Sequence, residues 1–219
     1  MVFRNREEAG EQLAEALARE RLEPPVVVLG IPRGGVPVAA KVAEVLGAPL
    51  GVIVARKLGA PFQPELAIGA VAADGTLYLD RDIAEIAGAD DAYIAKERIR
   101  QTREAREREA RFNGARIGDV RGKTVVVVDD GIATGATAIA ALRSLKARGA
   151  GRVVLAVPVG PPDTIRRLRQ EADEVICLCE APSFFAVGQF YEEFGQVDDD
   201  EVAALLATTV GTEEMHAPP

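Results

Sequence analysis

The sequence lacks several residues on which catalytic and metal sites often depend. Its 219 residues include no tryptophan, two cysteines and one histidine. The histidine, His216, lies in the C-terminal stretch GTEEMHAPP, which we expect to be a frayed end. An internal histidine is therefore excluded as a general base or metal ligand. The cysteines, Cys177 and Cys179, are too few for a zinc site, and we interpret them as core thiols in a reducing compartment.

Long apolar stretches are also missing. No run approaches the length of a membrane span, and the first residues, MVFRNREEAGEQL, contain no apolar segment typical of an export signal. We therefore expect a cytoplasmic protein without membrane contact.

Basic residues are absent from the last part of the chain. No Lys or Arg follows Arg169, whereas twelve of the 34 Asp and Glu do. The net charge is −8 and no basic stripe stands out, so we expect no nucleic-acid partner. All 26 Lys and Arg lie in the preceding part, which could attract a small polyanion.

Short β-branched runs alternate with helical patterns along the chain. The runs expected to form buried strands are 26–29, 50–55, 124–130, 152–159 and 174–179. This alternation predicts an α/β fold with a mainly parallel sheet flanked by helices. An N-terminal helix should begin at a capping box of Asn5 and Glu8 and end at Pro24–Pro25.

A segment in the middle of the chain departs from this alternation. Residues 65–80 predict a hairpin turning at Asp74–Gly75, and residues 82–112 predict one long charged helix. The helix is typical of a solvated arm with internal ion pairs, and a phosphate-binding surface is the alternative. We expect one domain over 1–219, made of a core (about 22–58 and 122–180), an inserted arm (about 60–121) and a C-terminal hood (about 181–210).

One arrangement that suits phosphate occurs twice. A buried strand, a glycine-rich turn and a helix follow each other in VVVLGIPRGGVPVAA and again in VVVVDDGIATGATAIAA. The glycines let the backbone approach a ligand, and the helix N-terminus offers unpaired N–H groups. In a parallel sheet both turns lie at the carboxyl edge, so a ligand with phosphates at two places is indicated.

The residues of these turns suggest a particular ligand. Asp129 and Asp130 end a strand, where their carboxylates can accept hydrogen bonds from a sugar's hydroxyls, and the turn over 131–137 can hold a monophosphate. This chemistry suits a ribose 5-phosphate. Arg33 in the first turn and Arg56–Lys57 could neutralise a pyrophosphate, although the latter could also be a solvated pair.

These residues resemble a known family. VVVVDDGIATGAT resembles the motif with which type I phosphoribosyltransferases bind 5-phosphoribosyl 1-diphosphate (PRPP), and GIPRGG resembles their pyrophosphate loop. VARKLGAP resembles the stretch that supplies a basic residue to the diphosphate, and FFAVGQFY resembles the hood of purine-type members. The resemblance covers roughly 26–60 and 120–195, and it is closest to a predicted group without an assigned substrate.

The resemblance implies an enzyme that uses PRPP and Mg²⁺ to transfer a 5-phosphoribosyl group to a nitrogenous base, with release of pyrophosphate. It also implies a homodimer. The residues implied to bind the ribose and 5-phosphate are Asp129, Asp130, Gly131, Ile132, Ala133, Thr134, Gly135, Ala136 and Thr137. Those implied to bind pyrophosphate are Arg33, Gly34, Gly35, Arg56 and Lys57. The implied catalytic set is Asp129, Asp130, Arg33 and Lys57, with the two aspartates as candidate Mg²⁺ ligands and Phe185 as the candidate base-stacking ring.

Other interpretations compete with this one. A response-regulator pocket would need further Asp and Lys residues after later strands, and a Walker P-loop would need G-K-[ST]; neither pattern is present. The aromatic residues over 184–194 could pack in the core instead of stacking on a base. Ala133 stands where hypoxanthine-guanine enzymes carry an Asp, and adenine-type members also have Ala at this position. A PRPP-binding regulatory module that has lost catalysis is the alternative function.

Overall fold

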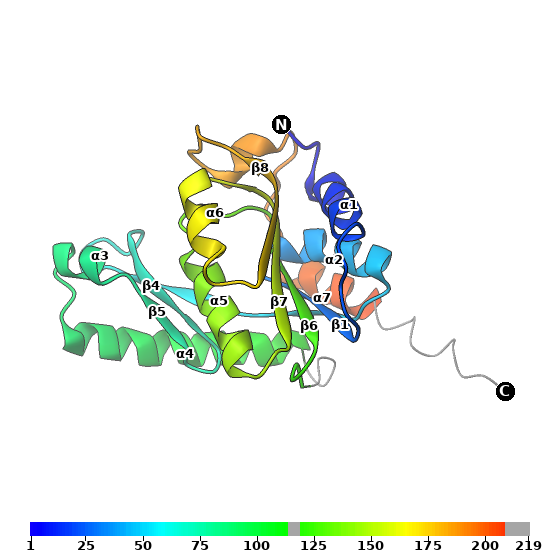
Figure 1. Cartoon of the computed structure of the whole chain (residues 1–219). Coiled ribbons are helices and arrows are strands. Elements are labelled where there is room, and N and C mark those ends of the chain that lie inside the picture. Colours follow the sequence, from blue (N-terminus) through cyan, green and yellow to red (C-terminus); the bar gives the residue numbers. More distant parts are fainter. Residues whose placement is uncertain (114–118, 209–219) are drawn as a thin grey trace.

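A five-stranded parallel sheet forms the centre of the molecule (Figure 1). The computed structural model describes residues 1–113 and 119–208, so His216 lies outside the described residues. The strands of this sheet are β1 (Val26–Gly30), β2 (Leu50–Val52), β6 (Thr124–Val128), β7 (Arg152–Gly160) and β8 (Glu174–Glu180). They lie in the order β2-β1-β6-β7-β8, and every pair is parallel.

Helices cover both faces of this sheet (Figure 1). One face carries α1 (Arg6–Leu17), α2 (Gly35–Leu46) and α7 (Asp199–Thr208), and the other carries α5 (Ala136–Ala147) and α6 (Pro162–Leu168). Successive strand residues point to opposite faces, so Val126 and Val128 of β6 pack toward α2 while Val125 and Val127 pack toward α5. This two-sided burial explains the continuous apolar runs, and the predicted α/β fold is confirmed.

The N-terminal helix begins as the sequence predicts. The N–H of Glu8 donates to Asn5 Oδ1 at 3.0 Å, which satisfies one of the free N–H groups at the helix start. The predicted end was wrong, because α1 stops at Leu17, well before Pro24–Pro25.

A second, antiparallel sheet lies beside the first and belongs to the arm (Figure 1). Its strands are β3 (Ala55–Gly59), β4 (Ala67–Ala72) and β5 (Leu77–Leu79), and its helices are α3 (Arg81–Ile86) and α4 (Asp91–Asn113). The predicted hairpin is confirmed, with Gly75 in the left-handed region at φ 91°. The prediction of one helix over 82–112 was wrong, because Gly88 at φ 68° separates α3 from α4.

The expected strand over 50–55 is also divided. Its partner β1 ends at Gly30, whose carbonyl accepts the N–H of Ile53 at 3.1 Å, and among the described residues no neighbouring strand of the parallel sheet continues beyond this point. The chain therefore leaves the parallel sheet and pairs with β4 from Ala55 onward. Arg56 and Lys57 consequently lie inside the second sheet.

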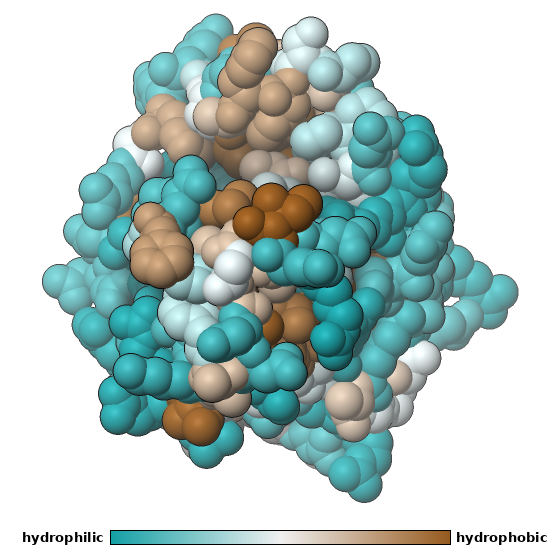
Figure 2. Space-filling view, turned by 90° about the vertical axis from the view of Figure 1, so that its left-hand side faces the viewer, coloured by the Kyte–Doolittle hydropathy of each residue, from teal (hydrophilic) through white to brown (hydrophobic). Residues whose placement is uncertain are grey.

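The arm helix α4 is fixed to the parallel sheet at its C-terminal end. Asn113 donates to the carbonyl of Val52 and accepts its N–H, each at 2.8 Å, and Glu109 accepts the N–H of Val54 at 2.9 Å. The face in Figure 2, which looks onto the arm, is largely hydrophilic with hydrophobic side chains in small groups. Within the residues described, no helix combines the length and apolar character needed to cross a bilayer.

Candidate active site

Two glycine-rich turns meet at the carboxyl edge of the parallel sheet. Strands β1 and β6 are neighbours, with Gly30 opposite Val128, and the N–H of Ile31 donates to the carbonyl of Val128 at 2.8 Å. The turns that follow, 31–34 and 129–135, therefore start side by side. This places them as expected for a ligand that bridges both.

The glycines of the first turn leave room for the acids of the second. A Cβ at Gly34 would lie 1.9 Å from Asp130 Oδ2, and a Cβ at Gly35 would lie 2.8 Å from the Cα of Asp129. Neither approach is possible for a residue with a side chain unless the surroundings shift. The GIPRGG and DDGIATGAT segments thus interlock at their glycines and carboxylates.

Arg6 binds the carboxylate of Asp130. Its Nε donates to Asp130 Oδ2 at 2.7 Å, its Nη1 donates to the carbonyl of Gly195 at 2.8 Å, and its guanidinium lies 3.9 Å from the ring centroid of Phe194. The side chains of Arg6 and Asp130 are each 12% exposed. Sequence reasoning missed Arg6, because the two residues are 124 positions apart and no local pattern joins them.

The hood and the N-terminal segment both contact Asp130 and pair with each other. Tyr191 donates its hydroxyl to the carbonyl of Asp130 at 2.6 Å. The N–H of Phe3 donates to the carbonyl of Phe190, and the N–H of Glu192 donates to the carbonyl of Phe3, both at 2.8 Å. The N-terminal residues are therefore part of the hood's structure.

The surroundings of Asp129 and Asp130 disfavour ionisation of both carboxyl groups at once. Removal from water, followed by the neighbouring charge of Asp130, raises the pKa of Asp129 well above its usual range. Burial also raises the pKa of Asp130, although the hydrogen bond from Arg6 opposes this. A cation that arrives with a substrate would relieve this concentration of negative charge.

The second turn presents backbone N–H groups. The hydroxyl of Thr164 on α6 donates to the carbonyl of Ala133 at 2.9 Å, and the guanidinium of Arg167 donates to the carbonyl of Thr134. Within a planar trans peptide the carbonyl and the next N–H point in opposite directions, so the N–H groups of Thr134 and Gly135 point away from α6.

These N–H groups are available to a ligand. Among the described residues, those of Thr134, Gly135 and Ala136 find no protein acceptor. Gly135 has φ 78°, and α5 begins at the next residue, so these N–H groups add to the positive end of the helix dipole. The arrangement forms a cradle for one anionic group.

The predicted cations separate into three places. Arg56 faces α4, where Nε donates to Gln101 Oε1 and Nη2 pairs with Glu104 Oε2, both at 2.7 Å. Lys57 lies on the opposite face of β3, pairs with Glu65 at 3.0 Å and lines a hollow of about 230 Å³ together with Thr134. The structure thus brings Lys57, but not Arg56, to the second turn.

Arg33 lies at a third place. Its Nη1 is 3.8 Å from Asp199 Oδ1 at the start of α7. The peptide bond between Pro32 and Arg33 is cis.

The aromatic side chains of the hood divide into buried and exposed ones. Phe190 and Tyr191 are buried, and Phe184 packs on Phe190 with ring centroids 5.3 Å apart. Phe185, by contrast, is 91% exposed. Packing in the core therefore accounts for part of the cluster and leaves Phe185 free to meet a ligand.

Both cysteines lie on the last strand of the parallel sheet. Cys177 and Cys179 are half-buried free thiols on β8. Burial raises the pKa of Cys177 to about 11, so this thiol stays protonated near neutral pH.

Known proteins resemble the chain over nearly all of its length. Residues 4–194 match the family model described as a phosphoribosyl transferase domain. Two Mycobacterium tuberculosis proteins, each named "Putative phosphoribosyl transferase", are 50% identical over 206 residues, which is 94% of this chain and 46% of each relative. The chain thus spans about half the length of these curated relatives.

Two further matches extend the comparison. A ribose-phosphate pyrophosphokinase from Pyrococcus furiosus is 32% identical over 136 residues, covering 60% of this chain and 46% of that protein. The crystal structure of TT1426 from Thermus thermophilus has a TM-score of 0.80 and 46% identity, covering 95% of this chain and 99% of that one. A parallel sheet flanked by helices with these turns at its carboxyl edge is the type I phosphoribosyltransferase fold, and the chain belongs to the phosphoribosyl transferase family.

Proposed function

We propose that this protein transfers a 5-phosphoribosyl group from PRPP to a nitrogenous base and releases pyrophosphate. The observation that carries the proposal is the junction of two glycine-rich turns around the carboxylates of Asp129 and Asp130. The names of its relatives support the same class of reaction.

The homodimer that the family resemblance implies stays a prediction, and light scattering after size exclusion tests it.

The second turn suits the 5-phosphate of this substrate. The free N–H groups of residues 134–136 can donate to phosphate oxygens at the start of α5. The family resemblance implies Lys57 for the diphosphate, but Lys57 lines the hollow that adjoins the second turn, so we assign its positive charge to the 5-phosphate instead. The carboxylates of Asp129 and Asp130 then lie one turn away, where they can accept hydrogen bonds from ribose hydroxyls.

The first turn suits the leaving diphosphate. In the transfer, the bond between the anomeric carbon and the diphosphate oxygen breaks, and its electron pair leaves with the diphosphate. The base nitrogen supplies the electron pair of the new bond and gives up its proton to water. Arg33 and the backbone of Gly34 and Gly35 would stabilise the departing charge, and charge stabilisation of this kind is commonly the largest catalytic contribution.

The donor groups fit Mg²⁺ that is held mainly by the substrate. The described residues contain no group of three or more potential ligands among His, Cys, Asp and Glu, so the protein alone does not build a full coordination shell. Asp129 and Asp130 supply carboxylate oxygens, and Mg²⁺ usually keeps waters and substrate oxygens besides one or two carboxylates. When bound, the ion would neutralise charge on the diphosphate oxygens.

One observation favours the alternative, a PRPP-binding module without catalysis. The hood approaches the second turn closely, since a Cβ at Gly131 would lie 2.6 Å from a methyl group of Val187. In a binding module the hood's own side chains can occupy the place that a base would need. The exposed ring of Phe185 favours the enzyme, because it remains free to stack on a base.

A screen of nucleobases with PRPP and Mg²⁺, followed by pyrophosphate release, tests the proposal. A base that stimulates release supports transfer, and calorimetry with MgPRPP measures binding separately. Asp130→Asn should weaken MgPRPP binding about tenfold or more, while Asp163→Asn at an exposed position on α6 should not. Binding without release for any base would leave the binding module, and absence of both would refute the proposed function.

A further inference from the structure

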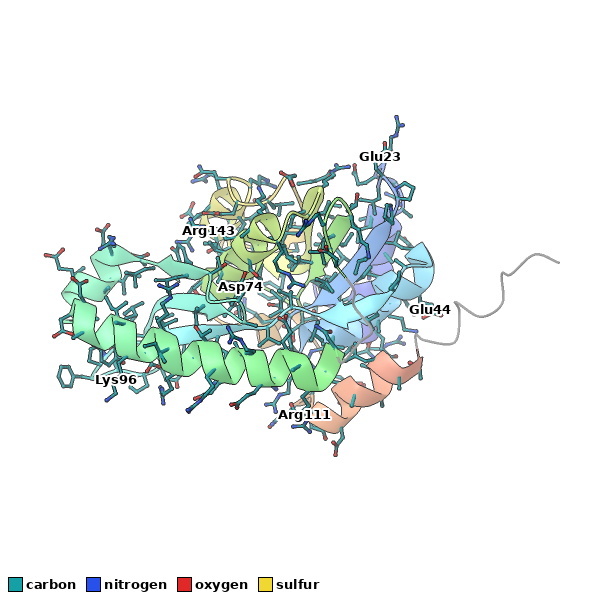
Figure 3. The ribbon with its side chains drawn as sticks, turned by 90° about the horizontal axis from the view of Figure 1, so that it is seen from below. Glu23, Glu44, Asp74, Lys96, Arg111 and Arg143 are labelled. Atoms are coloured by element: carbon teal, nitrogen blue, oxygen red, sulfur yellow. The ribbon has the colours of Figure 1, made fainter. Side chains whose placement is uncertain are left out.

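Three arginines from two distant segments converge on one carboxylate. Arg108 Nη2 donates to Asp199 Oδ1 at 2.7 Å, and Arg111 Nη1 donates to Oδ2 at 3.1 Å. Arg33 Nη1 lies 3.8 Å from Oδ1. Figure 3 shows Arg111 at the end of α4, beside α7. Because Arg33 also lies near Asp199, the arm and the first turn meet at the start of α7.

The positive charge of this cluster exceeds what Asp199 can satisfy. Both carboxylate oxygens already accept from Arg108 and Arg111, and 3.8 Å is too long for a hydrogen bond to Arg33. Arg108 Nε is buried and has no acceptor among the described residues. The adjacent Asp200 is exposed and makes no ion pair within the described part of the chain.

Contacts at the end of the arm helix position these arginines. Asn113 and Glu109 bond the end of α4 to the edge of the parallel sheet. In the sequence Glu109 lies between Arg108 and Arg111, and Asn113 lies two residues after the second. The guanidinium of Arg108 also lies over Phe112, 5.7 Å from the ring centroid. The Arg108 side chain, 25% exposed and held in this way, suits an anion site, because little of its side-chain entropy is lost on binding.

A phosphoryl group would satisfy the cluster better than a carboxylate does. Asp199 offers two oxygens to three arginines, whereas a terminal phosphoryl group offers three oxygens and more negative charge. We propose that Arg108 and Arg111 of the arm complete, with Arg33, a binding site for one phosphoryl group of the diphosphate, and that Asp199 is a built-in competitor for that site. This inference rests on the proposed function, because Arg33 belongs to the turn assigned to the diphosphate.

The competitor role gives Asp199 a part in product release. When a diphosphate binds, its oxygens replace those of Asp199 on the guanidinium groups. When it leaves, Asp199 pairs with Arg108 and Arg111 again, so the arginines never remain without a counter-charge. The arm thereby supplies ligands to the diphosphate and also limits how tightly the product is held.

Calorimetry of the full chain with inorganic pyrophosphate tests this inference at constant ionic strength, because salt screens exposed charges. Asp199→Asn removes the competing charge but keeps an acceptor oxygen, and it should tighten pyrophosphate binding about tenfold. Asp200→Asn, the same change one residue further on, should leave binding unaltered. Arg111→Gln, at a side chain 61% exposed, should weaken binding about three- to tenfold, while Arg103→Gln on the same helix should not.

The outcomes separate this inference from the proposed function. Equal pyrophosphate affinities for Asp199→Asn and Asp200→Asn would overturn the competitor role, and equal affinities for Arg111→Gln and Arg103→Gln would overturn the site. If either occurs while MgPRPP still binds and depends on Asp130, only this inference is lost. If the wild type binds neither pyrophosphate nor MgPRPP, the proposed function fails as well. Thermal melting of each variant shows whether it is folded. If Asp199→Asn melts at a lower temperature than the wild type, the comparison of Arg111→Gln with Arg103→Gln decides the test.

Discussion

Replacing Arg6 with methionine would remove the one cation that contacts the Asp130 carboxylate among the described residues. Methionine keeps an unbranched apolar chain of similar reach, so the change is mainly one of charge and hydrogen bonding. The carboxylate would then be buried against Gly34 without its partner. An ion pair with both side chains 12% exposed is close to the buried limit, where loss of one partner costs about 3–5 kcal/mol.

The expected loss for Arg6→Met is near the lower end of that range. Water at the carboxyl edge can reach part of the carboxylate and reduces the penalty, while loss of the contact with Phe194 adds about 0.5–1 kcal/mol. We therefore expect the free energy of unfolding to fall by about 3 kcal/mol. For a chain of this size the melting temperature should fall by about 6–12 °C.

Urea denaturation with a shared m-value measures this change. Arg4→Met is the matched control, because Arg4 is exposed and its side chain makes no ion pair within the described residues. In the variant with both Arg6→Met and Asp130→Asn, the loss should be smaller than the sum of the two single losses, since no buried charge is left unpaired. If Arg6→Met and Arg4→Met unfold at the same urea concentration, the ion pair contributes nothing and the reasoning is refuted.

The Arg6→Met loss should also depend on pH. Without the guanidinium, the pKa of Asp130 rises further above its unfolded value, because burial then acts unopposed. A carboxyl whose pKa is raised in the folded state destabilises that state when ionised. The difference in stability between wild type and Arg6→Met should therefore shrink as the pH falls and Asp130 takes up a proton. A constant difference across the acidic range would contradict this account.

Three further substitutions test the packing of the site, the hood and the arm. Gly34→Ala places a methyl group 1.9 Å from an Asp130 oxygen, so it should lower the free energy of unfolding by about 1–3 kcal/mol and weaken MgPRPP binding. The control Gly195→Ala meets no atom within 4 Å and should leave the free energy of unfolding, measured by urea denaturation, nearly unchanged. Phe185→Ala should raise the KM for the base severalfold, corresponding to about 1–3 kcal/mol of stacking, and leave MgPRPP binding unchanged in calorimetry. An unaltered KM would remove Phe185 from the base site. Asn113→Ala leaves two strand groups without partners and should lower the free energy of unfolding by about 1–3 kcal/mol, and a neutral result would show that water replaces the side chain.

The order of the core elements was predictable because each depends on a local pattern. The valine run before Asp129 predicts a strand buried on both faces, and the glycines after it predict a turn into a helix. The division near Ile53 was not predictable in this way, since the residues stay apolar while the partner strand ends. The separation of α3 from α4 at Gly88 had a local signal, a glycine after a short helical run, which the charge pattern of the longer helix obscured.

The contacts that complete the site were beyond local patterns. Arg6 reaches Asp130 only because the N-terminal segment pairs with the hood, and Arg167 supports the second turn only because α6 packs beside it. Neither arginine differs in sequence from a solvated surface residue. A sequence shows which residues could carry charge to a site, but pairings across 33 positions for Arg167 and 124 positions for Arg6 depend on the packed fold.

The bonds from Asn113 to β2 and from Glu109 to Val54, just beyond β2, have a consequence for assembly. The parallel sheet has two edge strands, β2 and β8, and an edge strand with free backbone groups can pair with a strand of another molecule. The side chains of α4 occupy the outward backbone groups of Val52 and Val54, so they act as a substitute for the next strand. Within the part of the chain that the structure describes, these bonds oppose strand pairing of a second copy at Val52 and Val54, the edge beside the candidate active site.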